Sequence, residues 1–482
     1  MKRGTISLYT IRIYDFKKVY LLEELIRVFL RPDQYVMVPE APGMEIQTAK
    51  KTEFEQDRIN KNIDKAQMLE FNCSRSQDRN EIKREIYRKL SHITGKKPPW
   101  GILTGIRPVK LFGETLERTG DLQAAEKHMK DVFILSDSKL NLIKGMYLRQ
   151  KAAIGIAERN SAGIYIGIPF CPTRCVYCSF ASNQVEHGEI EEYLKALLHE
   201  VEEIGRLMKE NGTVIETVYI GGGTPTTLTA HEMDLLMTCI EESFDLSNLK
   251  EFTVEAGRPD SITEEKLKVI RDHGADRISI NPQSMKPETL EKIGRNHSPE
   301  DIEKAFDTAS SFDFPCINTD VIAGLPDEEL QDFMMTLEKV VSMNPENVTV
   351  HSLTVKRASR LKHLDPEYHY GQGEKVASML DKAHEYLLDK GYLPYYLYRQ
   401  KNMSGALENT GYAKPGTEGI YNMRIMDEHQ TIIALGAGGI SKAYDFNSGK
   451  LKRVPDVTNY REYIDRTDEM IKRKRENIFT EV

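Results

Sequence analysis

The sequence has few cysteines, no long apolar run and no excess of positive charge. Six cysteines in 482 residues are too few for a disulfide framework, so we expect a reduced, cytoplasmic protein. No apolar run approaches the roughly 18 residues of a membrane-spanning helix. Residues 1–14 are too polar and mixed for a secretory signal peptide. The net charge of −8 argues against nucleic acid as a partner.

Three of the six cysteines stand close together. Cys171, Cys175 and Cys178 have the spacing CxxxCxxC, directly after a short apolar run. Cysteine thiolates hold iron–sulfur clusters, normally four per [4Fe–4S] cluster, so three would leave one iron open to a cofactor. A zinc knuckle and three unrelated buried cysteines are the alternatives, although zinc would need a fourth ligand at zinc-finger spacing. The remaining cysteines are isolated and are expected to be small buried apolar groups: Cys73, Cys239 and Cys316.

The chain length and the change of pattern along it predict three domains. Residues 1–160 carry no catalytic motif and are expected to form an α+β domain with a helical connector. Its role is either to cover the neighbouring domain or bind a partner, or to be a structural appendage. Residues 371–482 are expected to form a mixed α/β domain that covers the substrate. Strands are predicted there over 395–399, 421–426 and 431–435, and a polar terminal helix is predicted from Asp456.

Between these regions, short strands alternate with amphipathic helices. Because six strand–helix units appear rather than eight, residues 161–370 are predicted to form an open (β/α)6 partial TIM barrel. In parallel α/β folds, ligands bind at the carboxyl ends of the strands, and the polar motifs of this chain follow the predicted strands. These strands cover 164–168, 217–220, 251–255, 277–280, 316–322 and 347–353.

The cysteine spacing and Gly221-Gly222-Gly223-Thr224-Pro225-Thr226, about forty residues later, resemble the radical S-adenosylmethionine (AdoMet) enzymes. Within that class the chain resembles the oxygen-independent coproporphyrinogen III oxidases, also called coproporphyrinogen dehydrogenases, over roughly residues 160–450. Residues 99–108 and 411–416 are similar to the branch with an extra N-terminal domain. The resemblance implies a radical AdoMet barrel, with a [4Fe–4S] cluster on Cys171, Cys175 and Cys178.

The resemblance also implies the residues that bind AdoMet, and it implies two AdoMet molecules, because the family holds a second one beside the first. Glycines let the backbone approach a ligand closely, and Gly222 is expected to bind the first AdoMet together with Tyr165, Glu255 and Ile440. Contacts to the second are implied for Tyr177, Gly223, Thr224, Gln283, Arg295, Asp320 and Leu353. Singly, each could instead be structural, and core packing is the alternative role for Leu353 and Ile440.

Two positions depart from the well-studied oxidases. Phe180 stands where they carry a further cysteine, and Gly167 stands where they carry a histidine. The haem-chaperone branch of the family also has a phenylalanine at the first position. However, its C-terminal His-Asn…Tyr-Trp stretch is missing from this chain, which has Ile420-Tyr421-Asn422-Met423 there. These departures concern the substrate rather than the cofactors.

The reaction that the resemblance implies is the oxidative decarboxylation of two coproporphyrinogen III propionates to vinyl groups, which gives protoporphyrinogen IX in haem biosynthesis. The alternatives are a haem-binding chaperone and a radical methyltransferase or haem-degrading enzyme. An electron donor such as flavodoxin or ferredoxin is expected, and the sequence does not identify it or the oligomeric state. Basic residues just past the sixth strand are expected to bind substrate carboxylates, unless they form a solvated loop: Lys356, Arg357, Arg360 and Lys362.

Overall fold

The computed structural model describes residues 9–14, 20–40, 67–72, 79–105, 107–178, 180, 182–356, 359–365, 368, 371–400 and 404–479. The chain divides into two compact units. Unit 1 comprises Met1–Lys144, His369–Gly373 and Ser404–Leu407, and unit 2 comprises Gly145–Tyr368, Glu374–Met403 and Glu408–Val482. The predicted division into three domains stays a prediction. The C-terminal strands described below share a sheet with the barrel strands.

Unit 1 contains a small parallel sheet in the order β2-β1-β3. Its strands are β1 (Tyr9–Tyr14), β2 (Tyr35–Glu40) and β3 (Gln67–Asn72). Its helices are α1 (Tyr20–Phe29), α3 (Arg79–Thr94), α4 (Pro108–Thr119) and α5 (Leu122–Phe133). The connector helix α6 (Asp137–Ile154) follows, and the Ser136 hydroxyl accepts a hydrogen bond from the Lys139 backbone N–H.

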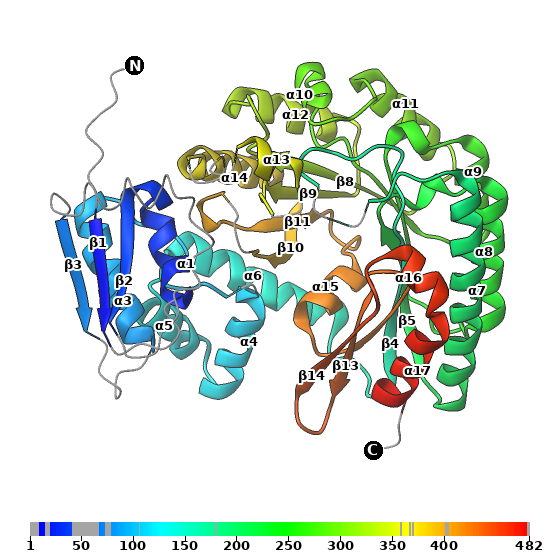
Figure 1. Ribbon diagram of the computed structural model, residues 1–482, viewed down its shortest axis with the longest axis horizontal. Helices are drawn as coiled ribbons and strands as arrows, with labels where there is room; N and C mark the ends of the chain where they lie inside the picture. The colour runs from blue at the N-terminus through cyan, green and yellow to red at the C-terminus, as the bar shows by residue number, and fades with distance from the viewer. Residues whose placement is uncertain are drawn as a thin grey trace. The chain divides into compact units, whose positions relative to one another are not determined.

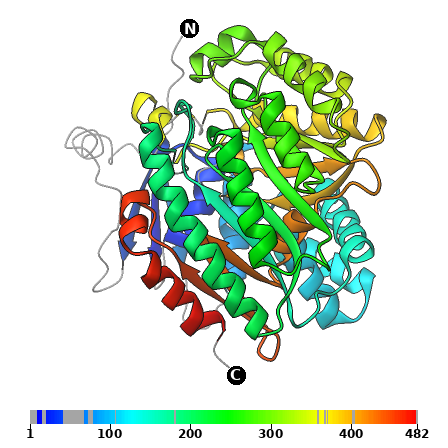
Figure 2. The ribbon, with the colours of Figure 1, turned by 90° about the vertical axis from the view of Figure 1, so that its right-hand side faces the viewer.

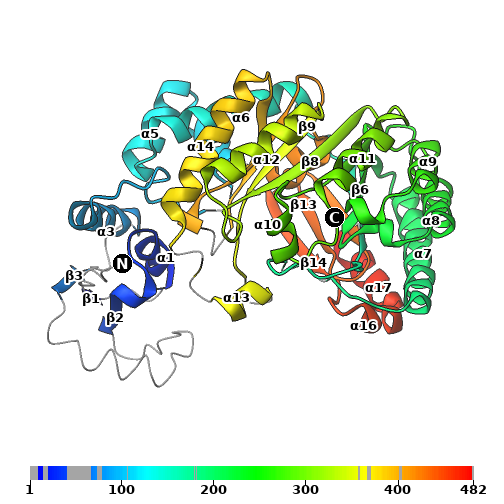
Figure 3. The same cartoon turned by 90° about the horizontal axis from the view of Figure 1, so that it is seen from above.

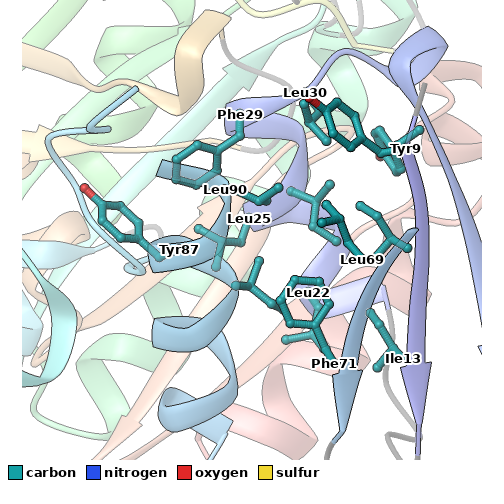
Figure 4. Close-up of a cluster of buried hydrophobic side chains, with 14 of the residues drawn as sticks. Tyr9, Ile13, Leu22, Leu25, Phe29, Leu30, Leu69, Phe71, Tyr87 and Leu90 are labelled. Carbon is teal, nitrogen blue, oxygen red and sulfur yellow. The ribbon is translucent and has the colours of Figure 1, made fainter. Parts of the chain in front are cut away.

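The core of unit 1 forms between this sheet and helices α1 and α3 (Figure 4). Alternate residues of a strand share one face, so Ile11 and Ile13 of β1 point to the same side as Phe71 of β3. The helices contribute residues at three- and four-residue spacing, and Phe29 meets the ring of Tyr87 edge-on at 5.3 Å. The apolar residues on one face of the helices and one face of the sheet therefore form one continuous apolar cluster.

Unit 2 is built on an eleven-stranded sheet (Figure 1) in the order β10-β11-β9-β8-β7-β6-β5-β4-β12-β13-β14. The six strands β4 to β9 are parallel and follow one another in the sheet, which confirms the open (β/α)6 core. They cover β4 (Ser161–Ile168), β5 (Val214–Gly222), β6 (Glu251–Gly257), β7 (Arg277–Ile280), β8 (Cys316–Ala323) and β9 (Asn347–Ser352). Each predicted strand overlaps one of these.

Helices cover the outer face of this sheet (Figure 2), and the view from above shows them arranged around its curve (Figure 3). Several begin with a capping box, as in α8, where Thr229 and Glu232 satisfy each other's backbone N–H groups. The helices between the strands are α7 (His187–Glu210), α8 (Ala230–Ser243), α9 (Glu264–Asp272), α10 (Pro287–Lys292), α11 (Pro299–Ser310) and α12 (Leu330–Ser342). Helices α13 (Arg360–Leu364) and α14 (Gly373–Asp389) follow β9.

The C-terminal strands extend both edges of the barrel sheet. Strand β11 (Asn409–Ala413) pairs antiparallel with β9 and with β10 (Leu393–Tyr398). At the other edge, β12 (Thr431–Leu435) pairs parallel with β4, and β13 (Ile440–Asp445) pairs antiparallel with β12 and β14 (Lys450–Pro455). Two of these strands, β10 and β12, lie where the sequence predicted them.

One prediction for the C-terminal region is wrong, and the predicted polar terminal helix is confirmed with a later start. Residues 421–426 form helix α15 (Ile420–Asp427) rather than a strand. Tyr421 and Arg424 are three residues apart and both buried, and Arg424 forms an ion pair with Glu216 of β5 that a strand's alternation would not predict. The terminal helices are α16 (Tyr460–Asp465) and α17 (Thr467–Ile478), which begin after Asp456 because the Asn459 side chain caps α16. Among the described residues, no helix is long and apolar enough to cross a membrane.

Candidate metal and cofactor site

A cavity of about 460 Å³ opens within unit 2 at the carboxyl ends of the barrel strands. All three cysteines of the CxxxCxxC motif line it. So do the following predicted cofactor residues: Tyr165, Tyr177, Gly222, Gly223, Thr224, Glu255, Gln283, Arg295, Asp320 and Leu353. Ile440 is not among the described lining residues; it begins β13, and 49% of its surface is exposed. The fold thus gathers most of the predicted set in one place.

The cysteine loop is held by backbone and side-chain bonds from several directions. Cys171 and Asn183 are joined through the Cys171 N–H and the Asn183 carbonyl at 3.0 Å, and the Val176 N–H donates to the Ile293 carbonyl at 2.9 Å. The Thr173 hydroxyl donates to the Gly294 carbonyl and accepts from the Arg258 guanidinium at 2.7 Å. A loop fixed at both ends and in the middle presents its side chains in one arrangement.

The three cysteines are free thiols; Cys175 is buried, and Cys171 and Cys178 are partly buried. Burial raises the pKa of the Cys171 thiol to about 11, although a hydrogen bond from Thr224 opposes the shift. Burial also raises the pKa of Cys178. A bound metal would supply the positive charge that favours the thiolate form of these two cysteines, so this donor set fits a metal centre.

Within the described parts of the chain, no three His, Cys, Asp or Glu side chains are placed to hold one metal ion. Cysteines that bind a multinuclear cluster need not converge on one point, because each thiolate binds a different iron. The preference for an iron–sulfur cluster over a zinc knuckle comes from the CxxxCxxC spacing and the family resemblance.

The glycine run serves close packing between β4 and β5. A Cβ atom on Gly223 would lie 2.4 Å from the Phe170 carbonyl oxygen and 3.0 Å from Cys171 Sγ. Gly222 has a φ of +117°, and its Cβ would lie 2.9 Å from the Ile168 oxygen. The N–H groups of Gly223 and Thr224 already donate to the Ile168 and Phe170 carbonyls. These glycines thus bring the strand end against the cysteine loop.

Two carboxylates project into the cavity in different electrostatic states. Burial raises the pKa of Glu255 to about 7, although Tyr219 donates to its Oε1 at 2.5 Å. Burial would also raise the pKa of Asp320, but His351 holds it below its ordinary value. Asp320 Oδ2 lies 3.4 Å from His351 Nε2. The cavity therefore offers one carboxylate that titrates near neutrality and one that stays ionised.

Arg295 and Gln283 have unused hydrogen-bonding capacity in the cavity. Arg295 donates to the Asn281 carbonyl and lies 3.4 Å from the Tyr177 hydroxyl, while its Nε has no partner. No carboxylate pairs with it among the described residues. Gln283 adopts the left-handed backbone conformation, with a φ of +68°, and its Oε1 is buried without a partner. Strained residues with unsatisfied polar atoms are typical of ligand sites.

The sequence did not single out His351 or three tyrosines of the cavity, Tyr219, Tyr398 and Tyr421, although Tyr165 beside them was a predicted cofactor residue. Tyr165, Tyr219 and Tyr421 stack on one another, with ring centroids 4.5 Å apart for the last two. Tyr398 lies 3.5 Å from His351 Nδ1 and adds to this wall. His351 lies one residue before the end of β9, where ligand residues were expected, so its strand position was a usable signal. Tyr421 could not be found this way because it lies on a helix predicted as a strand.

The predicted basic loop is only partly described. Lys356 lines the cavity, and Arg360 is exposed on α13 and is not among the described lining residues. Arg357 and the side chain of Lys362 lie outside the described residues. Phe180, at the position of the family's further cysteine, also lines the cavity and is 63% exposed.

Comparison with known proteins agrees with this site. Residues 165–340 match the radical SAM superfamily. The oxygen-independent coproporphyrinogen-III oxidase-like protein HemZ of Bacillus subtilis is 42% identical over 405 residues, which are 82% of this chain and 81% of that protein. The heme chaperone HemW of Bacillus subtilis is 31% identical over 299 residues, which are 61% of this chain and 75% of that protein. The solved structure of coproporphyrinogen III oxidase HemN from Escherichia coli matches with a TM-score of 0.50 and 21% identity, over 67% of this chain and 72% of that chain.

The chain therefore belongs to the radical SAM superfamily and, within it, to the family of oxygen-independent coproporphyrinogen III oxidases and their relatives. That family implies a [4Fe–4S] cluster and AdoMet. Three free cysteine thiols and the unpartnered atoms of Gln283 and Arg295 fit these groups. The roles of individual residues, and the number of AdoMet molecules, stay predictions.

Proposed function

We propose that this protein is an anaerobic coproporphyrinogen III dehydrogenase, which converts two propionate side chains to vinyl groups. The observation that carries the proposal is the single cavity in which three free cysteines meet unpaired polar groups at the strand ends. The identity with an oxidase-like relative over most of both chains supports it. When bound, the cluster and AdoMet supply the radical that removes hydrogen from the substrate; the protein positions the reactants and excludes water.

In this proposal, the polar groups of the cavity bind two AdoMet molecules. Arg295 has no carboxylate partner among the described residues and is suited to the methionine carboxylate. Asp320, kept ionised by His351, accepts hydrogen bonds from ribose hydroxyls. Gln283 Oε1 takes a further donor from the same ligand. The stacked tyrosines Tyr219 and Tyr421 form another part of the cavity wall and help to exclude water.

The second candidate is a haem-binding chaperone that keeps the cluster for another purpose. The 31% identity with a heme chaperone favours it, as does Phe180, which that branch shares. Both candidates use the same cluster, so cluster content alone does not separate them. They differ in turnover, since only the dehydrogenase releases carbon dioxide.

The test is anaerobic turnover of the reconstituted protein with coproporphyrinogen III, AdoMet and a chemical reductant. We expect protoporphyrinogen IX, carbon dioxide and 5′-deoxyadenosine as products, and mass spectrometry detects them. AdoMet should also change the electron paramagnetic resonance signal of the reduced cluster. Tight haem binding without vinyl product would instead support the chaperone, and a methylated porphyrin would support a methyltransferase.

A further inference from the structure

The size of the cavity limits what part of a tetrapyrrole can enter it. Its volume of about 460 Å³ lies near the low end of the range of about 300–1,000 Å³ typical of pockets for one drug-sized ligand. A macrocycle with four acidic arms meets the mouth of this cavity first, so residues at the mouth are placed to recognise it.

Phe180 is an exposed aromatic residue at this mouth. Its ring lines the cavity, yet 63% of the residue is exposed, which makes it one of the most exposed large apolar residues described. The tyrosines of the cavity wall, in contrast, are packed against one another. An exposed ring leaves a face open, and aromatic faces stack on flat heterocycles such as pyrrole rings.

Lys356 places a positive charge beside that ring. Its Nζ lies 5.5 Å from the centroid of the Phe180 ring, and its side chain lines the same cavity. Among the other cationic side chains that line the cavity, Arg258 pairs with Asp260 and Arg277 pairs with Glu251, while Arg295 contacts Tyr177. No carboxylate of the described residues pairs with Lys356, and its ionisable neighbour is the Cys178 thiol. A partly buried ammonium without a carboxylate partner is suited to a carboxylate ligand.

We propose that Phe180 and Lys356 together form the outer substrate contact, in which the ring stacks on one pyrrole and the ammonium binds a propionate carboxylate. The inference rests on the proposed function, since it assumes a tetrapyrrole carboxylic acid as the ligand. It assigns to Phe180 a binding role at a position where other family members carry a cysteine. It also narrows the predicted basic loop to a single residue.

The test measures porphyrin binding by the anaerobically reconstituted full-length protein. Two probes are used, coproporphyrin III and its tetramethyl ester, which has the same ring without the charges. Lys356→Met should raise the Kd for coproporphyrin about tenfold and leave the Kd for the ester within about twofold. Lys356→Arg should retain most of the affinity. Phe180→Ala should weaken both probes by about three- to tenfold, because the ring contact does not depend on charge.

Iron content and the AdoMet-induced spectral change serve as checks that the variants fold and load normally. Lys382→Met, on an exposed lysine of α14 paired with Glu385, is the matched control and should bind both probes like the wild type. If Lys356→Met binds coproporphyrin as tightly as the wild type, or loses the ester equally, the inference is wrong while the proposed function stands. Failure of the wild type to bind either probe would overturn both.

Discussion

At the scale of single residues, the three motif cysteines differ from the other two that the structure describes. Cys171, Cys175 and Cys178 line one cavity, whereas Cys239 lies on α8 with its Sγ 3.7 Å from the Leu198 carbonyl. Cys316 lies in β8 beside Arg277. Cys73 lies outside the described residues. The same residue type thus has different surroundings in one chain, and substitution tests whether the roles differ as well.

We predict that serine at any one of the three motif positions abolishes the cluster. Anaerobic reconstitution of the wild type should give about four irons per chain, and each motif variant should give close to none. Cys239→Ser and Cys316→Ser should keep the iron content and the visible absorbance of the wild type. Loss of iron in either control, or stoichiometric zinc in the wild type, would contradict the assignment.

Glu255 predicts a pH dependence of stability whose sign is unusual for a carboxyl group. Its pKa in the folded protein, about 7, lies above the ordinary glutamate value of 4.5, so the folded state binds an extra proton between these pH values. Stability therefore falls as pH rises from about 4.5 to about 7 and is constant above. We predict that Glu255→Gln removes this loss, so the variant gains at most about 3 kcal/mol relative to the wild type across that window.

The measurement is chemical denaturation at pH 5 and pH 7.5 for both proteins. Glu265→Gln, an exposed acid on α9, is the control and should change stability by less than about 0.5 kcal/mol at either pH. An identical pH dependence for the wild type and Glu255→Gln would show that this carboxyl does not titrate near neutrality.

At the scale of elements, the C-terminal helix α17 is tied to α7 through a fully buried ion cluster. Lys474 Nζ lies 2.7 Å from Glu200 Oε1 and 2.5 Å from Asp456 Oδ1, and all three side chains are fully buried. Glu200 also accepts from the Tyr463 hydroxyl and the Gly436 N–H. The same helix α7 carries Tyr193, which donates to the Gly167 carbonyl at 2.6 Å, just before the cysteine loop.

We predict that Lys474→Met destabilises unit 2 by about 3 kcal/mol or more, because two buried carboxylates lose their common partner. The free energy of unfolding from urea denaturation gives the value. Lys472→Met lies on the same helix with an exposed side chain and should cost less than about 0.5 kcal/mol. Equal stability of the two variants would mean that the buried ion cluster makes no net contribution to the free energy of unfolding.

At the scale of the whole molecule, the chain has two compact units with separate cores. The one tryptophan, Trp100, is buried in unit 1, whereas the predicted cluster lies in unit 2. Tryptophan fluorescence and cluster absorbance therefore report on different units. Multidomain chains need not unfold in one step, so the two signals can be compared directly.

We predict that Phe71→Ala, in the core of unit 1, lowers the denaturation midpoint seen by fluorescence, at a cost of about 3–5 kcal/mol. The cluster absorbance should keep its midpoint. Phe252→Ala, buried in β6 of unit 2, should have the opposite pattern. If both signals shift together in both variants, the two units unfold as one.

Much of unit 2 could be predicted from the sequence because its signals are local. Six short runs such as 277–280 became strands, since alternation with amphipathic helices depends only on neighbouring residues. The cysteine spacing and the glycine run indicated the site for the same reason. The strand prediction for residues 421–426 failed because two buried residues at alternate positions are compatible with a strand. The ion pair between Arg424 and Glu216 joins residues 208 positions apart, so no local pattern could indicate it.

The sequence by itself determined the kind of chemistry: three thiolates at CxxxCxxC spacing at the end of a parallel strand. The tertiary structure decided which groups share that site and in what charge state. His351 keeps Asp320 ionised, Tyr219 bonds Glu255, and Lys356 lies over Phe180. These pairs come from segments far apart in the chain, and pKa values and unpaired charges depend on burial and distance in space, which no local pattern encodes.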